Sequence, residues 1–245
     1  MKSSNPLFRD TIFQNNNTTM VGMPMTVGGT INKLLLLTVI MFIAAGAVIY
    51  QFSLQRYDLV QIFMISGVIV SLIAALVMAF KPNITPYVAP IYAFSQGALL
   101  SGLSCFFEAS YPGIVIQAVS MTLFAVLAMG LLFKMQLITA TEKFRAIIFT
   151  ATFAIMIFYL VSFVISFFGV NVPYFSSNSN LSIFINVVIA VIAALNLIID
   201  FDNIDRGVKT PLPAFFEWYC AVGLLATIVW LYIEILRLLS RLKDR

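Results

Sequence analysis

Long runs of apolar residues, separated by short polar segments, fill the chain from residue 34 onward. Each run is about 20 residues long, which is the length that an α-helix needs to cross the hydrocarbon core of a bilayer. The pattern predicts seven transmembrane helices, at residues 34–52, 59–80, 87–107, 114–133, 146–168, 181–199 and 218–239. We therefore expect an all-α, polytopic membrane protein.

The first 33 residues follow a different pattern. They include the polar run Asn-Asn-Asn-Thr-Thr at 15–19, and glycine and proline recur between residues 22 and 29. Polar segments of this kind bury too little apolar surface to fold by themselves. The sequence therefore predicts a flexible polar arm at residues 1–33, followed by a transmembrane domain at residues 34–245.

Composition limits the classes of function. Hydrophobic residues make up 61% of the 245 positions, and only 14 basic and 10 acidic residues are present, whereas about 25% of a soluble domain is charged. The chain has no histidine, the commonest acid–base group and metal ligand near neutral pH. It also has no glycine-rich phosphate loop. We expect no enzymatic activity, no bound cofactor and no nucleic-acid partner, and we expect the lipid bilayer as the main partner.

The distribution of basic residues predicts the orientation in the membrane. Nine of the 14 basic residues belong to the side that holds the N-terminus and the connections after the second, fourth and sixth helices. Basic loops tend to stay in the cytoplasm, so we expect a cytoplasmic N-terminus. The C-terminal tail opposes this orientation, because it holds Arg237, Arg241, Lys243 and Arg245.

Asp200 is the first candidate for a polar site inside the membrane. Ionisable residues at membrane depth cost a few kcal/mol and mark functional sites by default. Asn196, Asp200 and Asn203 share one helix face, because they lie at positions i, i+4 and i+7. One interpretation is a polar site within the membrane. The alternative is a carboxylate that lies among lipid headgroups and water.

The seventh run carries the second group of candidates. Thr227 and Glu234 are seven residues apart and share one helix face. Glu234 also precedes Arg237 by three residues, so an intrahelical ion pair at the membrane interface is one interpretation. The alternative is that Glu234 lines the mouth of a polar path.

Small residues are concentrated in the third run. Ser95, Gly97, Ser101, Gly102 and Ser104 fall within ten residues of one another. Small residues let helix backbones approach closely in lipid, so the run favours close helix packing. The alternative is a helix that lies beside a hydrated pore.

Three segments carry a resemblance to a known family. They are residues 92–102 in the third helix, 198–204 at the end of the sixth, and 221–239 in the seventh. Over about residues 25–243 the sequence resembles the Bax-inhibitor family (transmembrane Bax inhibitor motif proteins), and within it a bacterial branch. The resemblance implies a multi-pass protein of the plasma (cell inner) membrane, in which six helices surround the last one. It also implies a calcium leak under pH control by two aspartates that share a proton.

The family's acidic pair is only half present in this chain. Asp200 matches the first aspartate, whereas Thr227 occupies the second position and Glu234 lies one heptad further, about 10.5 Å along the helix. Oxygen ligands suit calcium, so we expect Asp200, Asn196 and Thr227 to form a weak, partly hydrated cation site. In this interpretation Asp200 is the metal ligand, Glu234 lies on the ion pathway, and calcium binding is weak. The alternative, implied by the family's association with cell death and stress, is a non-conducting regulator that binds other membrane proteins.

Overall fold

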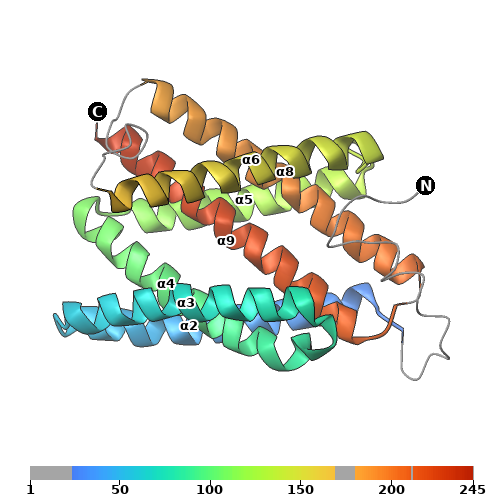
Figure 1. Cartoon of the computed structure of the whole chain (residues 1–245), viewed down its shortest axis with the longest axis horizontal. Coiled ribbons are helices and arrows are strands. Elements are labelled where there is room, and N and C mark those ends of the chain that lie inside the picture. The colour runs from blue at the N-terminus through green and yellow to red at the C-terminus, as the bar shows by residue number, and fades with distance from the viewer. Residues whose placement is uncertain (1–23, 169–179, 211, 245) are drawn as a thin grey trace. The chain divides into compact units, whose positions relative to one another are not determined.

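The structure is a computed structural model that describes residues 24–168, 180–210 and 212–244, apart from the side chain of Phe167. These residues form seven α-helices and one short 3-10 helix, with no β-strand among them (Figure 1). The helices are α2 (Val27–Ser53), α3 (Tyr57–Phe80), η2 (Pro82–Ile84), α4 (Thr85–Ser110), α5 (Ile114–Lys134), α6 (Glu142–Phe167), α8 (Asn180–Lys209) and α9 (Phe215–Lys243). The prediction of an all-α polytopic membrane protein is confirmed.

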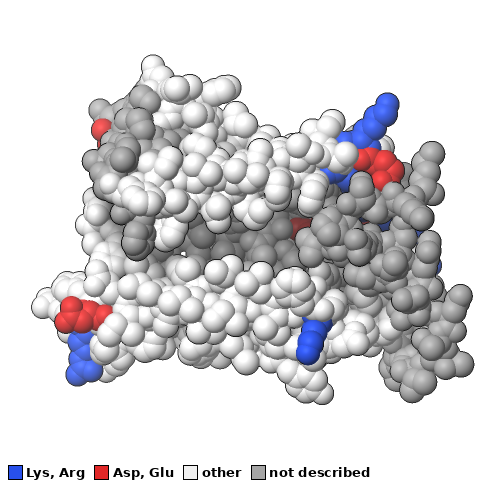
Figure 2. All heavy atoms as spheres, viewed as in Figure 1, with Lys and Arg blue, Asp and Glu red and all other residues white. Residues whose placement is uncertain are grey.

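Six of the described helices, all except α4, are long and apolar enough to cross a membrane. α4 has 26 residues, which is enough for a bilayer core of about 30 Å, but its serines, prolines and glutamine make it less apolar. Its membrane crossing therefore stays a prediction. Large apolar side chains cover much of the described surface, and the face seen in Figure 2 is mostly uncharged, as expected for helices that contact lipid.

α2 begins at Val27, seven residues before the predicted start of the first helix. Thr26 caps the helix, because its side-chain oxygen accepts a hydrogen bond of 2.9 Å from the backbone N–H of Gly29. Residues 27–33 of the predicted arm are thus helical, despite the two glycines at 28 and 29. Residues 1–23, the rest of that arm, lie outside the described residues.

α8 ends at Lys209, ten residues after the predicted end of the sixth helix. An ion pair between Asp205 and Lys209, at i and i+4, supports this extension. The basic residues of the last turn also interact favourably with the carbonyl end of the helix dipole. Asp200 consequently lies inside a helix and not in the connection that follows it.

The chain divides into two compact units. Unit 1 contains the residues up to Leu103 together with Asn203–Leu225. In this unit α4 packs closely on its neighbours, because a Cβ atom at Gly97 would overlap the carbonyl oxygen of Met41 on α2. Likewise, a Cβ atom at Gly67 of α3 would lie 2.7 Å from the carbonyl oxygen of Ser95. The small residues of the third run therefore serve close helix packing.

Unit 2 contains Ser104–Asp202 together with the chain from Ala226 onward. It includes α5, α6, most of α8 and the C-terminal part of α9. Hydrogen bonds join α9 to three helices in this unit: Ser104 of α4 bonds Tyr232, Tyr159 of α6 bonds Glu234, and Asn186 of α8 also bonds Glu234. Among the six candidate spans, α9 has the largest share of buried residues.

Candidate functional site

Asp200 and Thr227 meet in unit 2. Asp200 of α8 forms a side-chain hydrogen bond with Thr227 of α9. The second carboxylate oxygen, Oδ2, is buried and has no hydrogen-bond partner among the described residues. An isolated acceptor in the interior of a membrane protein is costly unless water or a cation contacts it. One interaction therefore anchors the Asp200 side chain. Its Oδ2 atom still has the capacity to bind a ligand.

Asn196 lies one helical turn before Asp200. Its amide nitrogen donates to Oγ1 of Thr152 on α6 and to the carbonyl oxygen of Ile192, both at 2.9 Å. These contacts place polar groups from α6, α8 and α9 at one level of unit 2. Of the four residues expected along the ion pathway, the structure thus joins Asp200 directly to Thr227 and places Asn196 on the adjacent turn.

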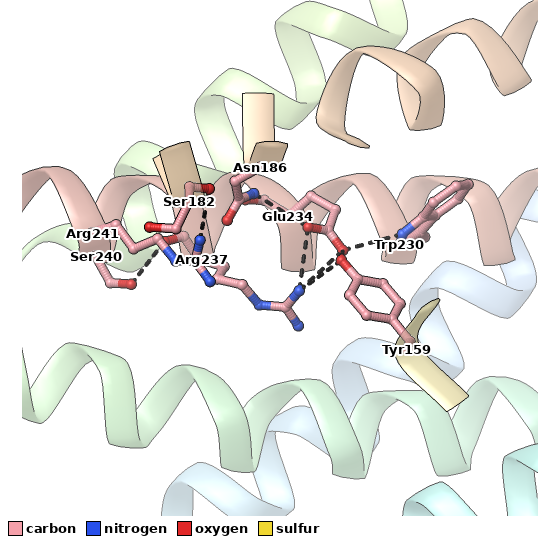
Figure 3. A network of polar contacts seen from close by, with 8 residues as sticks. All are labelled: Tyr159, Ser182, Asn186, Trp230, Glu234, Arg237, Ser240 and Arg241. Atoms are coloured by element: carbon pink, nitrogen blue, oxygen red, sulfur yellow. Dashed lines mark hydrogen bonds and ion pairs between the residues drawn. The ribbon is translucent and has the colours of Figure 1, made fainter. Parts of the chain in front are cut away.

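Glu234, the fourth expected pathway residue, belongs to a separate polar cluster (Figure 3). Its side chain is 1% exposed and accepts hydrogen bonds from Tyr159 at 2.8 Å, Trp230 at 3.2 Å and Asn186 at 3.2 Å. A side-chain nitrogen of Arg237 is the fourth donor and lies 3.3 Å from Oε1 of Glu234. The expected ion pair between Glu234 and Arg237 therefore forms, but Glu234 lies inside unit 2 and not at an exposed interface.

The Glu234 cluster is held together by further contacts. Arg237 donates to the Tyr159 hydroxyl at 2.9 Å and lies 5.4 Å from the centroid of the Tyr159 ring, within the range of a cation–π interaction. Asn186 is fully buried, and its amide nitrogen also donates to the backbone oxygen of Glu234 at 3.1 Å. Such a connected network is rigid. Because Arg237 balances the charge of Glu234 and four donors surround the carboxylate, this cluster does not attract a cation in the described state.

A third polar contact lies at the beginning of α6, where Arg145 forms an ion pair with Asp202 of α8. Arg145, Thr152 and Tyr159 are seven residues apart on α6 and therefore share one face. Polar contacts therefore lie at three levels along α6, and we call these levels the polar rungs. The first rung is Arg145 with Asp202, the second is Thr152 and Asn196 with the Asp200–Thr227 pair, and the third is Tyr159, Asn186, Glu234 and Arg237.

Sequence reasoning missed Thr152, Tyr159 and Asn186. The seven-residue spacing of polar side chains in the fifth apolar run was the available signal. That spacing identifies one polar face of α6, but it does not say which helices pack against the face. The partners come from the register between α6, α8 and α9, which depends on contacts between distant parts of the chain.

The site offers few ligands to a metal ion. Across the described ranges, no three His, Cys, Asp or Glu side chains converge in a way that would hold a metal. Calcium takes six to eight oxygen ligands, whereas the Asp200–Thr227 pair supplies one carboxylate and one hydroxyl. Water would have to provide the rest.

The fold and the rungs define a multi-pass, integral membrane protein with a polar face buried among apolar helices. The family model described as Bax inhibitor 1 like matches residues 5–244. Because the match covers nearly the whole chain, the protein belongs to this family. No curated protein and no solved structure matches the chain.

Proposed function

We propose that the protein is a passive calcium leak and that Asp200 is the group that attracts the ion. The observation that carries this proposal is the open Oδ2 atom of Asp200, which is buried and lacks a hydrogen-bond partner in the described part of the chain. A carboxylate at membrane depth, with no basic partner within four residues on its own helix, creates a local negative potential. Cation pathways use such groups.

Weak binding is what a leak requires. Conduction needs a site that favours entry yet releases the ion again. The Asp200–Thr227 pair provides only two ligand groups, so an ion there keeps most of its water. Thr227 in this scheme orients the carboxylate through its hydroxyl and adds no charge.

The test is calcium entry into dye-loaded liposomes that contain only this protein. Asp200→Asn keeps size and hydrogen bonding while it removes the charge, so we expect the initial flux to fall several-fold. Asp205→Asn is the matched control, because Asp205 lies on the same helix with a side chain that is 41% exposed and paired with Lys209. We expect the control to keep the parent flux. Equal flux in Asp200→Asn and the parent would refute the role of Asp200.

A second candidate is a non-conducting regulator that binds other membrane proteins. The Glu234 cluster favours it, since its four donors leave the carboxylate no capacity for an ion. The same liposomes separate the two candidates. A regulator would give the flux of protein-free liposomes at every protein-to-lipid ratio.

A further inference from the structure

We infer that the ion route follows the faces of α6, α8 and α9 that carry the polar rungs, and that an apolar layer between the second and third rungs closes it. Ile155 of α6, Ile189 of α8 and Leu231 of α9 form this layer. The inference rests on the proposed leak function and names the residues that would hold the leak shut. All three residues belong to unit 2.

The register of the helices places the layer. Thr152 contacts Asn196, and Arg145 contacts Asp202, so α8 runs antiparallel to α6. Ile155 lies three residues after Thr152 on α6, and Ile189 lies seven residues before Asn196 on α8. Each therefore falls on the same helix face as a second-rung residue and on the side toward the third rung.

α9 completes the layer from the other side. Leu231 follows Thr227 by four residues and precedes Glu234 by three, so it lies between the second and third rungs. Leu231 is 2% exposed and Ile189 is 3% exposed. The second and third rungs are about 10.5 Å apart along α6 and α9, and the residues that fall between them on these faces are the half-buried Ile155 and the buried Leu231.

Each side of the layer has an open acceptor oxygen. Asp200 Oδ2 in the second rung and Asn186 Oδ1 in the third are both buried without a hydrogen-bond partner in the described residues. The two residues are two heptads apart on α8, so they share one face. Water can bind at either atom, and the charge of Asp200 can also attract a partly hydrated cation, so the layer is a barrier between two polar regions.

The layer closes the route by excluding water. Hydrophobic constrictions gate channels by dewetting, because an ion cannot shed its hydration shell without replacement ligands. A hydroxyl in place of a buried alkyl group would give water a hydrogen-bond partner inside the layer. Such a change should open the route without altering any rung residue.

Ile189→Thr tests the inference, because it keeps the branched Cβ atom and replaces the ethyl group by a hydroxyl. Val191→Thr is the matched control on the same helix, since Val191 is 51% exposed. In the liposome assay we expect Ile189→Thr to raise the initial calcium flux several-fold above the parent, and Val191→Thr to leave it unchanged. Ile155→Thr changes the layer on α6 and should also raise the flux. It provides the test if Ile189→Thr does not purify as a monodisperse protein.

The outcomes separate this inference from the proposed function. A flux that Asp200→Asn lowers but neither layer variant raises would overturn the barrier and leave the leak in place. A parent without flux, together with calcium flux through Ile189→Thr or Ile155→Thr, would support the barrier and contradict the proposal that the parent itself leaks. Flux at the protein-free level in the parent and in both layer variants would overturn both proposals.

Discussion

Thr227 on α9 hydrogen-bonds the carboxylate of Asp200 on α8. The site was predicted from the resemblance to the Bax-inhibitor family. That resemblance implies an acidic residue at the position of Thr227, as the second of two. In this protein the contact between the two helices is a hydrogen bond between a hydroxyl and a carboxylate. Asp200 has no second carboxylate in this pair.

Thr227→Asp should restore the acidic pair. Two carboxylates within reach of each other cannot both ionise easily, so they titrate as a coupled unit. We expect calcium flux through Thr227→Asp to depend more steeply on pH between about 6 and 8 than flux through the parent. Thr227→Ser is the control and should keep the parent profile. The added steepness should vanish in the double variant with Asp200→Asn. A profile unchanged by Thr227→Asp would assign the pH response to another group.

Glu234→Gln should destabilise the protein. The change leaves Arg237 without its buried counter-charge, and the loss of one partner of such a pair costs about 3 kcal/mol, the low end of the usual range because Arg237 is 26% exposed. Tyr159→Phe removes two hydrogen bonds, one to Glu234 and one from Arg237, but keeps the ion pair, so it should cost only about 2 kcal/mol. Thermal unfolding in detergent measures both changes. Less destabilisation in Glu234→Gln than in Tyr159→Phe would contradict the structural role of the cluster.

Gly29 lies close to the carboxylate of Glu217. The Glu217 carboxylate accepts hydrogen bonds from the backbone and side chain of Thr26 and pairs with Lys33. A Cβ atom at Gly29 would overlap this carboxylate, whereas one at Gly28 would meet nothing within 4 Å. Both glycines lie in the first turn of α2.

We therefore expect Gly29→Ala to lower stability by about 1–3 kcal/mol through overpacking. Gly28→Ala is the matched control and should be neutral, or more stable by up to about 1 kcal/mol, because alanine favours helix over glycine. The midpoint temperatures of thermal unfolding of the two variants and the parent measure these changes in stability. If the two variants unfold alike, Glu217 does not hold the start of α2 as described.

The sequence predicted the positions of the α-helices better than the contacts between them. Runs of apolar residues predicted all seven described α-helices, and α5 begins at the predicted residue, Ile114. The end of α8 was predicted too early, because charged residues that pair within a helix, such as Asp205 and Lys209, continue it beyond the apolar run. The contact of Tyr159 with Glu234 was not predictable, since it depends on how α6 and α9 align.

The orientation of the chain remains a prediction from its basic residues. We expect the N-terminus in the cytoplasm of a cell with this protein in its plasma (inner) membrane, and the C-terminus outside. Single cysteines at Ser3 and Lys243, in a background without Cys105 and Cys220, report the two sides through membrane-impermeant thiol labelling. Lys243 suits this test because it is exposed, whereas Ser240 is 7% exposed. Labelling of both sites from one side would contradict the model of seven membrane-spanning helices.

The most direct test of the leak is the rate of calcium entry into liposomes that contain the purified protein alone, measured against the protein-to-lipid ratio. The account predicts an initial rate that rises in proportion to the protein and falls several-fold in Asp200→Asn, with both proteins incorporated to the same extent. A rate equal to that of protein-free liposomes at every ratio, or an Asp200→Asn rate equal to that of the parent, would contradict it.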